Sequence, residues 1–353
     1  MSDSPEFAID NFLEKHAVKY AIPRCTLRSL QDYGVMDARI LSILTKEEIF
    51  AIPGISERTA ESLSRVAHDQ FRGKLFKDGN QLAEYELTNV HYLTTGSKEI
   101  DTLLNGGIKT GTITEIIGEY RSGKTQLCMT CAVTAQLPFE QGGLNTKVIY
   151  IDTKNSFNIE HYSRIGKRFG LERDNLLKNI YIARGEQMRY FSEAIDRLPG
   201  YLQALDCRLI VIDSPMAPIE QEYTTLREYP VVQKLLQKLL GLWKRIALGF
   251  NCAVIFTNHV ERNLEPTIMQ YHPFVYAGDH AIAHRSDVRL VLRKLKENMR
   301  RIKVEACAWL PNEQTDFYLT SHGVYDEKTF PSEQNLEEVL SVEDFSEEFD
   351  FKY

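Results

Sequence analysis

The sequence has few cysteines, no long apolar run and no apolar segment at its start. Its six cysteines are scattered over 353 residues, which excludes a disulfide framework and indicates a reducing compartment. The longest apolar runs, such as Leu209–Ile212, fall far short of the ~18 residues that a membrane span needs. The polar start Met1–Glu6 does not resemble a secretory signal. We therefore expect a soluble protein of the cytosol or the nucleus, without a membrane partner.

Cys128 and Cys131 form the one close cysteine pair of the sequence. A redox or zinc site is one interpretation of this pair, but no second Cys/His pair lies nearby in the sequence. Their spacing puts both side chains on one face of a helix. We therefore interpret both as small buried apolar residues.

The net charge of −7 comes entirely from the end of the chain. After residue 330 there are eight acidic residues and one basic residue, whereas residues 1–330 hold 41 acidic and 41 basic residues. The acidic total is therefore no argument against a nucleic-acid partner for the rest of the chain. We expect the acidic tail, residues 328–353, to be a mobile arm, and a partner-docking motif is the alternative.

Residues 1–71 have apolar residues at helical spacing and predict a small all-α domain. Thr45, with an acid three residues later, predicts one helix start, and Ser56 predicts the start of a helix over Glu57–Val66. The Pro53-Gly54 turn between these helices resembles a helix-hairpin-helix, whose helix start can face a phosphate. An ordinary helical hairpin that packs its own core explains the pattern equally well.

Residues 72–91 are polar and predict a linker, and an α/β core follows over 92–327. Strands that alternate with longer helices indicate a mostly parallel sheet covered on both faces. The section Val288–Val324 has hairpin-like spacing and predicts added antiparallel strands. The predicted strands are Ile113–Ile117, Val148–Ile151, Ile180–Ala183, Leu209–Ile212, Ala253–Thr257 and Val288–Leu292.

A GxxxxGKT motif follows the first of these strands and opens a helix, which is the context that a phosphate-binding loop requires. Its glycines allow successive backbone N–H groups to surround phosphate oxygens. Lys124 is then expected to reach the β- and γ-phosphates, and the Thr125 hydroxyl to bind Mg²⁺. The residues that we expect at the nucleotide are Gly118, Glu119, Tyr120, Arg121, Ser122, Gly123, Lys124, Thr125 and Gln126.

Asp213 follows the four apolar residues Leu209–Ile212. Ligand sites of α/β proteins lie at the carboxyl ends of their strands, so Asp213 is a candidate to hold the metal ion through water. The alternative is that Asp213 or Ser214 caps the next helix.

Several collinear motifs resemble the RecA/RadA recombinases, in particular their eukaryotic and archaeal strand-exchange branch. The resemblance implies a RecA-like core that binds ATP and Mg²⁺, preceded by a helix-hairpin-helix domain. It also implies filaments of self or related protomers on single-stranded DNA, a role in homologous recombination, and a nuclear location, or a cytosolic one in an archaeon. The motifs are Leu93–Asp101, Gly106-Gly107-Ile108, Gly118–Gln126, Gln136-Leu137-Pro138, Tyr150–Thr153, Ile212-Asp213-Ser214, Thr257–Val260 and Ala281–His284.

One departure from this family concerns catalysis. The family's Asp-Thr-Glu-Gly, whose Glu positions the attacking water, reads Asp152-Thr153-Lys154-Asn155. A lysine with a pKa near ~10.4 is cationic and does not accept a proton. We expect Lys154 to hold the γ-phosphate of ATP without promoting its cleavage. The alternative is that Lys154 faces solvent and Glu119 or Glu160 replaces the missing acid.

The residues that the resemblance assigns to DNA also differ. His259 stands where the family has the Gln that relays nucleotide state, and it can still bind a phosphate. Only Arg227 remains basic in the first DNA loop, where Glu220 and Leu226 are the other aligned residues. The second DNA loop, Glu261–Ala277, contains Arg262. A basic group that follows it could track DNA, with Arg285 and Arg293 as our main candidates: Arg285, Arg289, Arg293, Lys294, Lys296, Arg300, Arg301 and Lys303.

The positions that join protomers are weakened too. The Asp-Ser-Pro that caps the neighbour's ATP reads Ala306-Cys307-Ala308, and the Phe-x-x-Ala of the linker is at best Phe76-Lys77-Asp78-Gly79. We therefore predict a divergent accessory recombinase that hydrolyses ATP slowly or never. The alternative is a fully active DNA-dependent ATPase that forms strand-exchange filaments.

Overall fold

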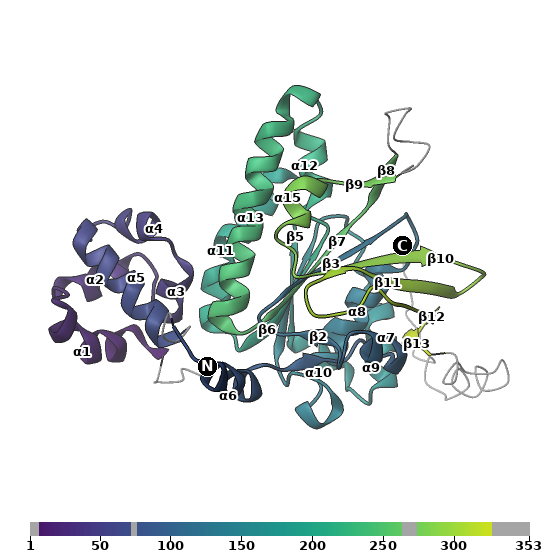
Figure 1. Ribbon diagram of the computed structural model, residues 1–353, viewed down its shortest axis with the longest axis horizontal. Coiled ribbons are helices and arrows are strands. Elements are labelled where there is room, and N and C mark those ends of the chain that lie inside the picture. Colours follow the sequence, from purple (N-terminus) through teal and green to yellow (C-terminus); the bar gives the residue numbers. More distant parts are fainter. Residues whose placement is uncertain (1–6, 72–75, 263–273, 327–353) are drawn as a thin grey trace, which may run out of the picture.

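The computed structural model of the chain describes residues 7–71, 76–262 and 274–326 (Figure 1). The predictions for the acidic tail and for the middle of the second DNA loop lie outside these residues. A small helical domain packs at one end of a larger α/β body, and helix α6 lies between them in sequence.

Residues 7–71 contain five α-helices of the N-terminal domain, and both predicted helix starts are confirmed. Thr45 and Glu48 form a capping box, in which the Thr45 hydroxyl accepts from Glu48 N–H at 3.2 Å and the Glu48 carboxylate accepts from Thr45 N–H at 2.7 Å. Ser56 Oγ accepts from Thr59 N–H at 3.2 Å. The helices are α1 (Ile9–Tyr20), α2 (Cys25–Asp32), α3 (Arg39–Ile43), α4 (Lys46–Phe50) and α5 (Glu57–Phe71).

The segment predicted as a linker contains helix α6 (Gly79–Asn89). Asp78 caps it by accepting from Gln81 N–H at 2.9 Å. None of its residues is buried, so its polar composition concealed the helix in the sequence.

Within the described residues, nine strands form the main sheet of the body, in the order β13-β12-β11-β10-β3-β7-β6-β4-β5. The strands from β10 to β5 are parallel, and β11 to β13 add antiparallel strands at the other edge. All six predicted strands and the antiparallel section are confirmed. The bounds are β3 (Ile113–Gly118), β4 (Lys147–Asp152), β5 (Ile180–Arg184), β6 (Cys207–Asp213), β7 (Ala253–Asn258), β10 (Val288–Lys294), β11 (Met299–Cys307), β12 (Gln314–Thr320) and β13 (Gly323–Tyr325).

Two further two-stranded sheets accompany this sheet in the described residues. The strands β1 (Tyr92–Leu93) and β2 (Ile108–Lys109) pair antiparallel near the start of the core. The strands β8 (Val260–Arg262) and β9 (Phe274–Tyr276) pair antiparallel next to the end of β7.

Helices cover both faces of the sheet, as the strand pattern predicted. One face packs into a single apolar cluster with α7 (Lys98–Leu103), α8 (Lys124–Thr134), α9 (Ile159–Arg168) and α10 (Arg173–Lys178). The other face packs against α11 (Met188–Ala204), α12 (Met216–Glu222), α13 (Tyr229–Phe250) and α15 (Asp279–Ala283). Trp243 of α13 is fully buried there.

The N-terminal domain shares the second of these clusters. Polar contacts fix its position, because the Gln203 side-chain oxygen of α11 accepts from the backbone N–H groups of Met36 (2.7 Å) and Asp37 (2.9 Å). In the ranges given above, no helix is long and apolar enough to cross a membrane.

Candidate nucleotide site

The phosphate-binding loop connects the buried strand β3 to helix α8. Arg121 and Gly123 have positive φ angles of 63° and 103°, so the loop turns its backbone inward. A Cβ atom at Gly118 would lie 2.6 Å from the Leu292 carbonyl oxygen, and one at Gly123 would overlap the Leu319 side chain. The β10 backbone thus requires glycine at position 118, and the positive φ favours glycine at position 123. The loop lies at the carboxyl edge of the parallel strands, where Asp152, Asp213 and Asn258 also end their strands.

Lys124 is the first residue of α8 and lies under this loop. Its Nζ donates to the carbonyl oxygens of Gly118 and Glu119 at 2.7 Å each, and the residue is 8% exposed. Burial lowers the pKa of Lys124 to about 8, and the positive charge of Lys154 is the second cause. Two cations therefore act on the same loop, which suits an anionic ligand.

Asp213 is the centre of a hydrogen-bonded group at the end of β6. It is 1% exposed and accepts from the hydroxyls of Thr125 (2.6 Å), Thr257 (2.5 Å) and Tyr150 (3.1 Å). Helix α12 is preceded by Pro215 and has no side-chain cap, so the capping role considered for Asp213 or Ser214 is wrong. Burial and the nearby Asp213 charge raise the pKa of Tyr150, so its hydroxyl stays a donor. The structure thus brings Thr125 and Asp213 together, and their oxygens are of the type that Mg²⁺ prefers.

Lys154 lies in an ordered loop after β4. The buried Asp152 carboxylate fixes this loop by accepting backbone N–H groups of Lys154 (3.1 Å), Ser156 (3.2 Å) and Phe157 (2.9 Å). The Lys154 side chain is exposed and forms no ion pair within the described residues. Its positive charge is the second cause of the lowered pKa of Lys124.

The two acids considered as substitutes differ in their contacts. Glu160 pairs with Arg173 at 2.7 Å, whereas Glu119 is an exposed residue of the phosphate loop. Glu119 is therefore the better candidate for a replacement base.

We predict that ATP affinity, measured in EDTA so that no metal contributes, is level below pH 8 and falls above it. The free protein loses the Lys124 proton above about pH 8, so binding of a phosphate must take one up, and affinity falls by up to about tenfold per pH unit. Lys154→Gln removes one cause of the lowered pKa and should move this fall to higher pH. A fluorescence titration with labelled ATP between about pH 7 and pH 9.5 checks both results, because ATP phosphates titrate near about pH 6. A fall that starts at the same pH in both proteins would contradict the coupling.

His259 follows β7 and lies next to Glu220, which the family resemblance aligned with the first DNA loop. Its Nε2 is 3.2 Å from the Glu220 carboxylate of α12. The structure thus links the position expected to relay nucleotide state with the position expected to start the first DNA loop. Arg227 is exposed in the short helix η3 (Leu226–Glu228), and the backbone of Arg262 ends β8.

The basic group is smaller than the sequence suggested. Arg289 and Arg300 are 6% and 8% exposed, so the interpretation that they form part of a DNA-facing surface is wrong. Alternation along β11 turns Arg300 inward, and Arg289 lies in the part of β10 that is buried on both faces. Arg301 pairs with Asp316 at 2.7 Å, and Lys303 pairs with Glu305 at 2.9 Å.

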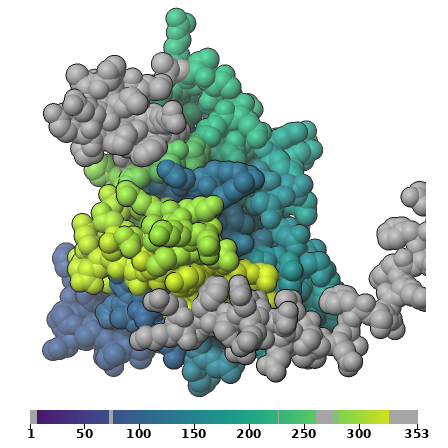
Figure 2. Space-filling model, turned by 90° about the vertical axis from the view of Figure 1, so that its right-hand side faces the viewer, coloured from purple at the N-terminus to yellow at the C-terminus, as the bar shows by residue number. Residues whose placement is uncertain are grey.

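Four basic residues of this group stay exposed: Arg285, Arg293, Lys294 and Lys296. In β10, Arg293 directly follows Leu292, which pairs with Gly118 in register. It therefore lies at the same edge of the sheet as the phosphate loop. Figure 2 views this side, with the yellow-green strands beside the blue segment that carries the loop.

Cys128 and Cys131 are fully buried in α8, as predicted. Burial raises the pKa of both thiols, so neither is a reactive thiolate. In the part of the chain that the structure describes, no three His, Cys, Asp or Glu residues are grouped to hold a metal ion.

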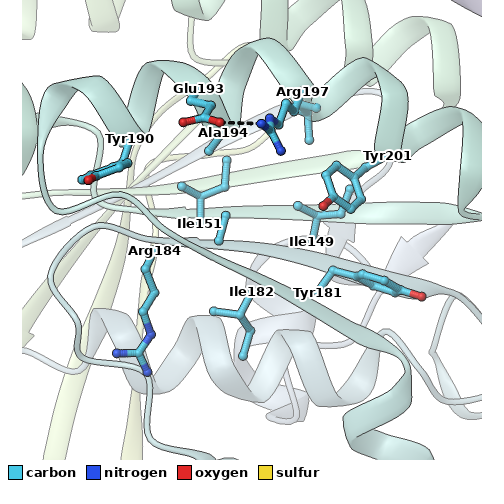
Figure 3. A pocket seen from close by; sticks show the side chains of 12 residues that line it. Ile149, Ile151, Tyr181, Ile182, Arg184, Tyr190, Glu193, Ala194, Arg197 and Tyr201 are labelled. Atoms are coloured by element: carbon cyan, nitrogen blue, oxygen red, sulfur yellow. Dashed lines mark ion pairs between the residues drawn. The ribbon is translucent and has the colours of Figure 1, made fainter. Parts of the chain in front are cut away.

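A pocket that the sequence analysis missed lies at the far edge of the sheet (Figure 3). Its volume is about 280 Å³, and it lies between the last strand β5 and helix α11. Ile149 and Ile151 form its floor beneath α11, which contributes Tyr190 and Tyr201. An ion pair between Glu193 and Arg197, 2.6 Å long, lies on its α11 side. Its lining comes from three separate segments, so no local sequence motif marks it.

Comparisons with known proteins agree with this geometry. The Rad51 family model matches residues 86–327. The DNA repair and recombination protein RadA of Aeropyrum pernix is 33% identical over 301 residues, which cover 85% of this chain and 93% of the relative. The DNA repair protein Rad51 homolog of Drosophila melanogaster is 35% identical over 303 residues (85% and 89%). The meiotic recombination protein DMC1 homolog B of Oryza sativa subsp. japonica is 34% identical over 302 residues (86% and 87%).

Proposed function

This chain belongs to the Rad51 family, and we propose that it is an ATP-binding member that acts on single-stranded DNA in recombination and repair while hydrolysing ATP slowly or not at all. The names of its relatives, which are DNA repair and recombination proteins, support the general role. We infer the nucleus as its location in a eukaryote and the cytosol in an archaeon, since both groups supply relatives.

The observation that carries the proposal is a complete phosphate site beside a lysine where the family has an acid. Lys124 and the glycine loop supply donors for phosphates, and Thr125 with Asp213 would hold Mg²⁺, which offsets phosphate charge when bound. The amine of Lys154 stabilises a bound triphosphate by its charge, but it does not take a proton from water. Binding is therefore retained and cleavage is lost.

A fully active ATPase is the second candidate. The exposed Glu119 beside Lys124 favours it, because a carboxylate at this loop could position water. Phosphate release by the purified protein separates the two candidates, and Glu119→Gln should abolish it only under the second.

Binding to single-stranded DNA tests the DNA part of the proposal. Affinity is expected to fall with rising salt, and Arg293→Ala should reduce the slope of log affinity against log salt by about 0.7, the value for one phosphate contact on a single strand. Arg173→Ala, which removes an exposed arginine that pairs with Glu160, is the control and should leave the slope unchanged. Salt-independent binding would contradict a DNA role.

Self-association is the remaining part of the proposal. Phe76 is 87% exposed, and the family resemblance assigns its segment to the contact between protomers. The pocket beside β5 offers the apolar floor of Ile149 and Ile151 to an aromatic ring, and β5 is an edge strand that can pair with another chain. We infer that Phe76 of one copy enters this pocket of the next copy or of a related recombinase.

Phe76→Glu is therefore expected to shift the protein towards the monomer, because a carboxylate placed against the isoleucine floor of the pocket loses hydration without gaining an apolar contact. Leu87→Glu is a matched control, since Leu87 of α6 is 86% exposed. Sedimentation velocity over a concentration series measures both. Equal association of Phe76→Glu and the unaltered chain would contradict the docking.

A further inference from the structure

Two arginines that the sequence placed in one basic group lie at opposite ends of strand β10. Arg293 is near its carboxyl end, at the edge of the sheet that carries the phosphate loop, whereas Arg285 precedes its amino end. The strand has seven residues, so at about 3.3 Å per residue its ends are roughly 20 Å apart. Arg285 is exposed, but it therefore does not belong to the surface around the phosphate loop.

Arg285 lies instead against helix α13. A Cβ atom at Gly241 would be 3.5 Å from Nη1 of Arg285 and 3.9 Å from Nη1 of Arg245. Gly241 thus leaves room for two guanidinium groups over the middle of the helix. Glycine is among the least favourable residues inside a helix, so this position loses helix stability. In Figure 1, α13 is the long helix beside α11, with α15 next to it.

The two guanidinium groups continue a line of lysines along the same face of α13. Positions 234, 238, 241 and 245 are three or four residues apart, so they lie on one side of the helix. The opposite side is buried, as Leu236 and Trp243 show, each 1% exposed. The helix rises about 1.5 Å per residue, so the line is roughly 16 Å long. We call these four cations the basic stripe: Lys234, Lys238, Arg245 and Arg285.

No carboxylate of α13 balances the basic stripe, because the sequence of this helix contains no acidic residue. Arg245 is 3.4 Å from Glu48 of the N-terminal domain. In the part of the chain that the structure describes, no ion pair involves Lys234, Lys238 or Arg285. Like charges four residues apart on a helix repel each other. The stripe is therefore a surface that an anionic ligand stabilises.

The stripe lacks the exposed aromatic rings that single-strand sites use. Such sites combine cations with aromatic side chains on which the bases stack. In α13, Trp243 and Phe250 are 1% and 8% exposed, and Tyr229 lies five positions before Lys234, on another side of the helix. Cations along a straight helix suit contacts to the regular phosphate backbone of a duplex, which carry no sequence information.

We propose that the basic stripe is a second nucleic-acid site, which binds the phosphate backbone of duplex DNA without regard to its sequence. The two guanidinium groups over Gly241 form its centre, since a guanidinium donates two parallel hydrogen bonds to one phosphate. The lysines extend the site as point charges. This inference goes beyond the proposed function, which places single-stranded DNA near Arg293 at the other end of β10.

The test compares the salt dependence of two labelled ligands, duplex DNA of random sequence and oligo(dT), both with saturating ATP. Lys234→Ala/Lys238→Ala/Arg285→Ala should reduce the duplex slope of log affinity against log salt by about 2.7, because each phosphate contact on a duplex contributes about 0.9. Its slope for oligo(dT) should not change. Arg293→Ala should show the reverse pattern, with an unchanged duplex slope.

Lys167→Ala/Arg173→Ala/Lys178→Ala is the matched control. It also removes two exposed lysines and one exposed arginine, but from α9 and α10 on the other face of the sheet, and it should keep both slopes.

Gly241→Glu is a second test that keeps all four cations. It places a carboxylate beside the two guanidinium groups and should weaken duplex binding. Gly241→Ala should keep duplex binding, because its Cβ atom makes only ordinary contacts. Circular dichroism checks that each variant is folded.

An unchanged duplex slope in the folded stripe variant, or an equal reduction in the matched control, would overturn the site. An equal reduction for oligo(dT) would assign the stripe to the single-strand site and would also overturn it. Retained duplex binding with lost binding of labelled poly(Glu) would assign the stripe to an acidic protein instead. If the unaltered chain binds oligo(dT) but no duplex, this inference fails and the proposed function stands. Binding of duplex without oligo(dT) is the opposite result.

Discussion

Lys154→Glu should raise ATP turnover in the presence of single-stranded DNA by about 10²-fold, which is the lower end of what a positioned general base contributes. The loop that carries this residue is held by Asp152 through three backbone N–H groups, so the backbone needs no rearrangement to present a carboxylate. The new Glu would occupy a position whose present charge acts on Lys124. The rate of phosphate release measures the change in turnover.

The control for this variant is Lys154→Gln, which removes the cation but adds no proton acceptor. Its turnover should stay at the level of the unaltered chain, while its ATP affinity falls. A rise in turnover in both variants would mean that the lysine charge blocks another base, of which Glu119 is the candidate. If turnover does not rise in Lys154→Glu, this chain lacks more of the catalytic machinery than the acid at position 154.

Lys124→Ala should weaken ATP binding by about 10²-fold, since charge-assisted hydrogen bonds contribute roughly 1.5–3 kcal/mol each. The amine is held between the Gly118 and Glu119 carbonyl oxygens at 2.7 Å, and burial and Lys154 lower its pKa to about 8. A bound phosphate places a negative charge beside the amine, which offsets both its burial and its repulsion by Lys154. Equilibrium titration with labelled ATP measures the loss.

Lys109→Ala is a suitable control, because this partly exposed lysine pairs with Glu86, away from the phosphate loop. It should bind ATP like the unaltered chain. Unchanged ATP affinity in Lys124→Ala would remove the nucleotide site from the proposed function, whatever the family relationship.

Much of the fold could be predicted because its signals are local. The strand segment Leu209–Ile212 is buried on both faces, so it is a continuous apolar run. The Thr45 capping box and the phosphate loop can each be recognised from a few adjacent residues. The proximity of Thr125 and Asp213 could also be predicted, because the carboxyl ends of parallel strands lie at one edge of the sheet.

The remaining features depend on contacts between distant parts of the chain. Arg289 was taken for a surface cation because its partner Glu115 is 174 residues away and one strand across the sheet. The pairing of His259 with Glu220 and the pocket beside β5 could not be predicted for the same reason, since the residues that form them are distant in the sequence. Helix α6 was missed for another reason, since an exposed helix has no apolar stripe, and its one local signal was the Asp78 cap.

The fate of bound ATP tests the central claim most directly. The purified chain is incubated with ATP, Mg²⁺ and single-stranded DNA, separated from free nucleotide, and its bound nucleotide is identified, with Lys124→Ala as the background for contaminating ATPases. If Lys154 holds the triphosphate without a proton acceptor beside it, the bound nucleotide is recovered as ATP. Recovery as ADP, with steady phosphate release above the Lys124→Ala background, would contradict the account.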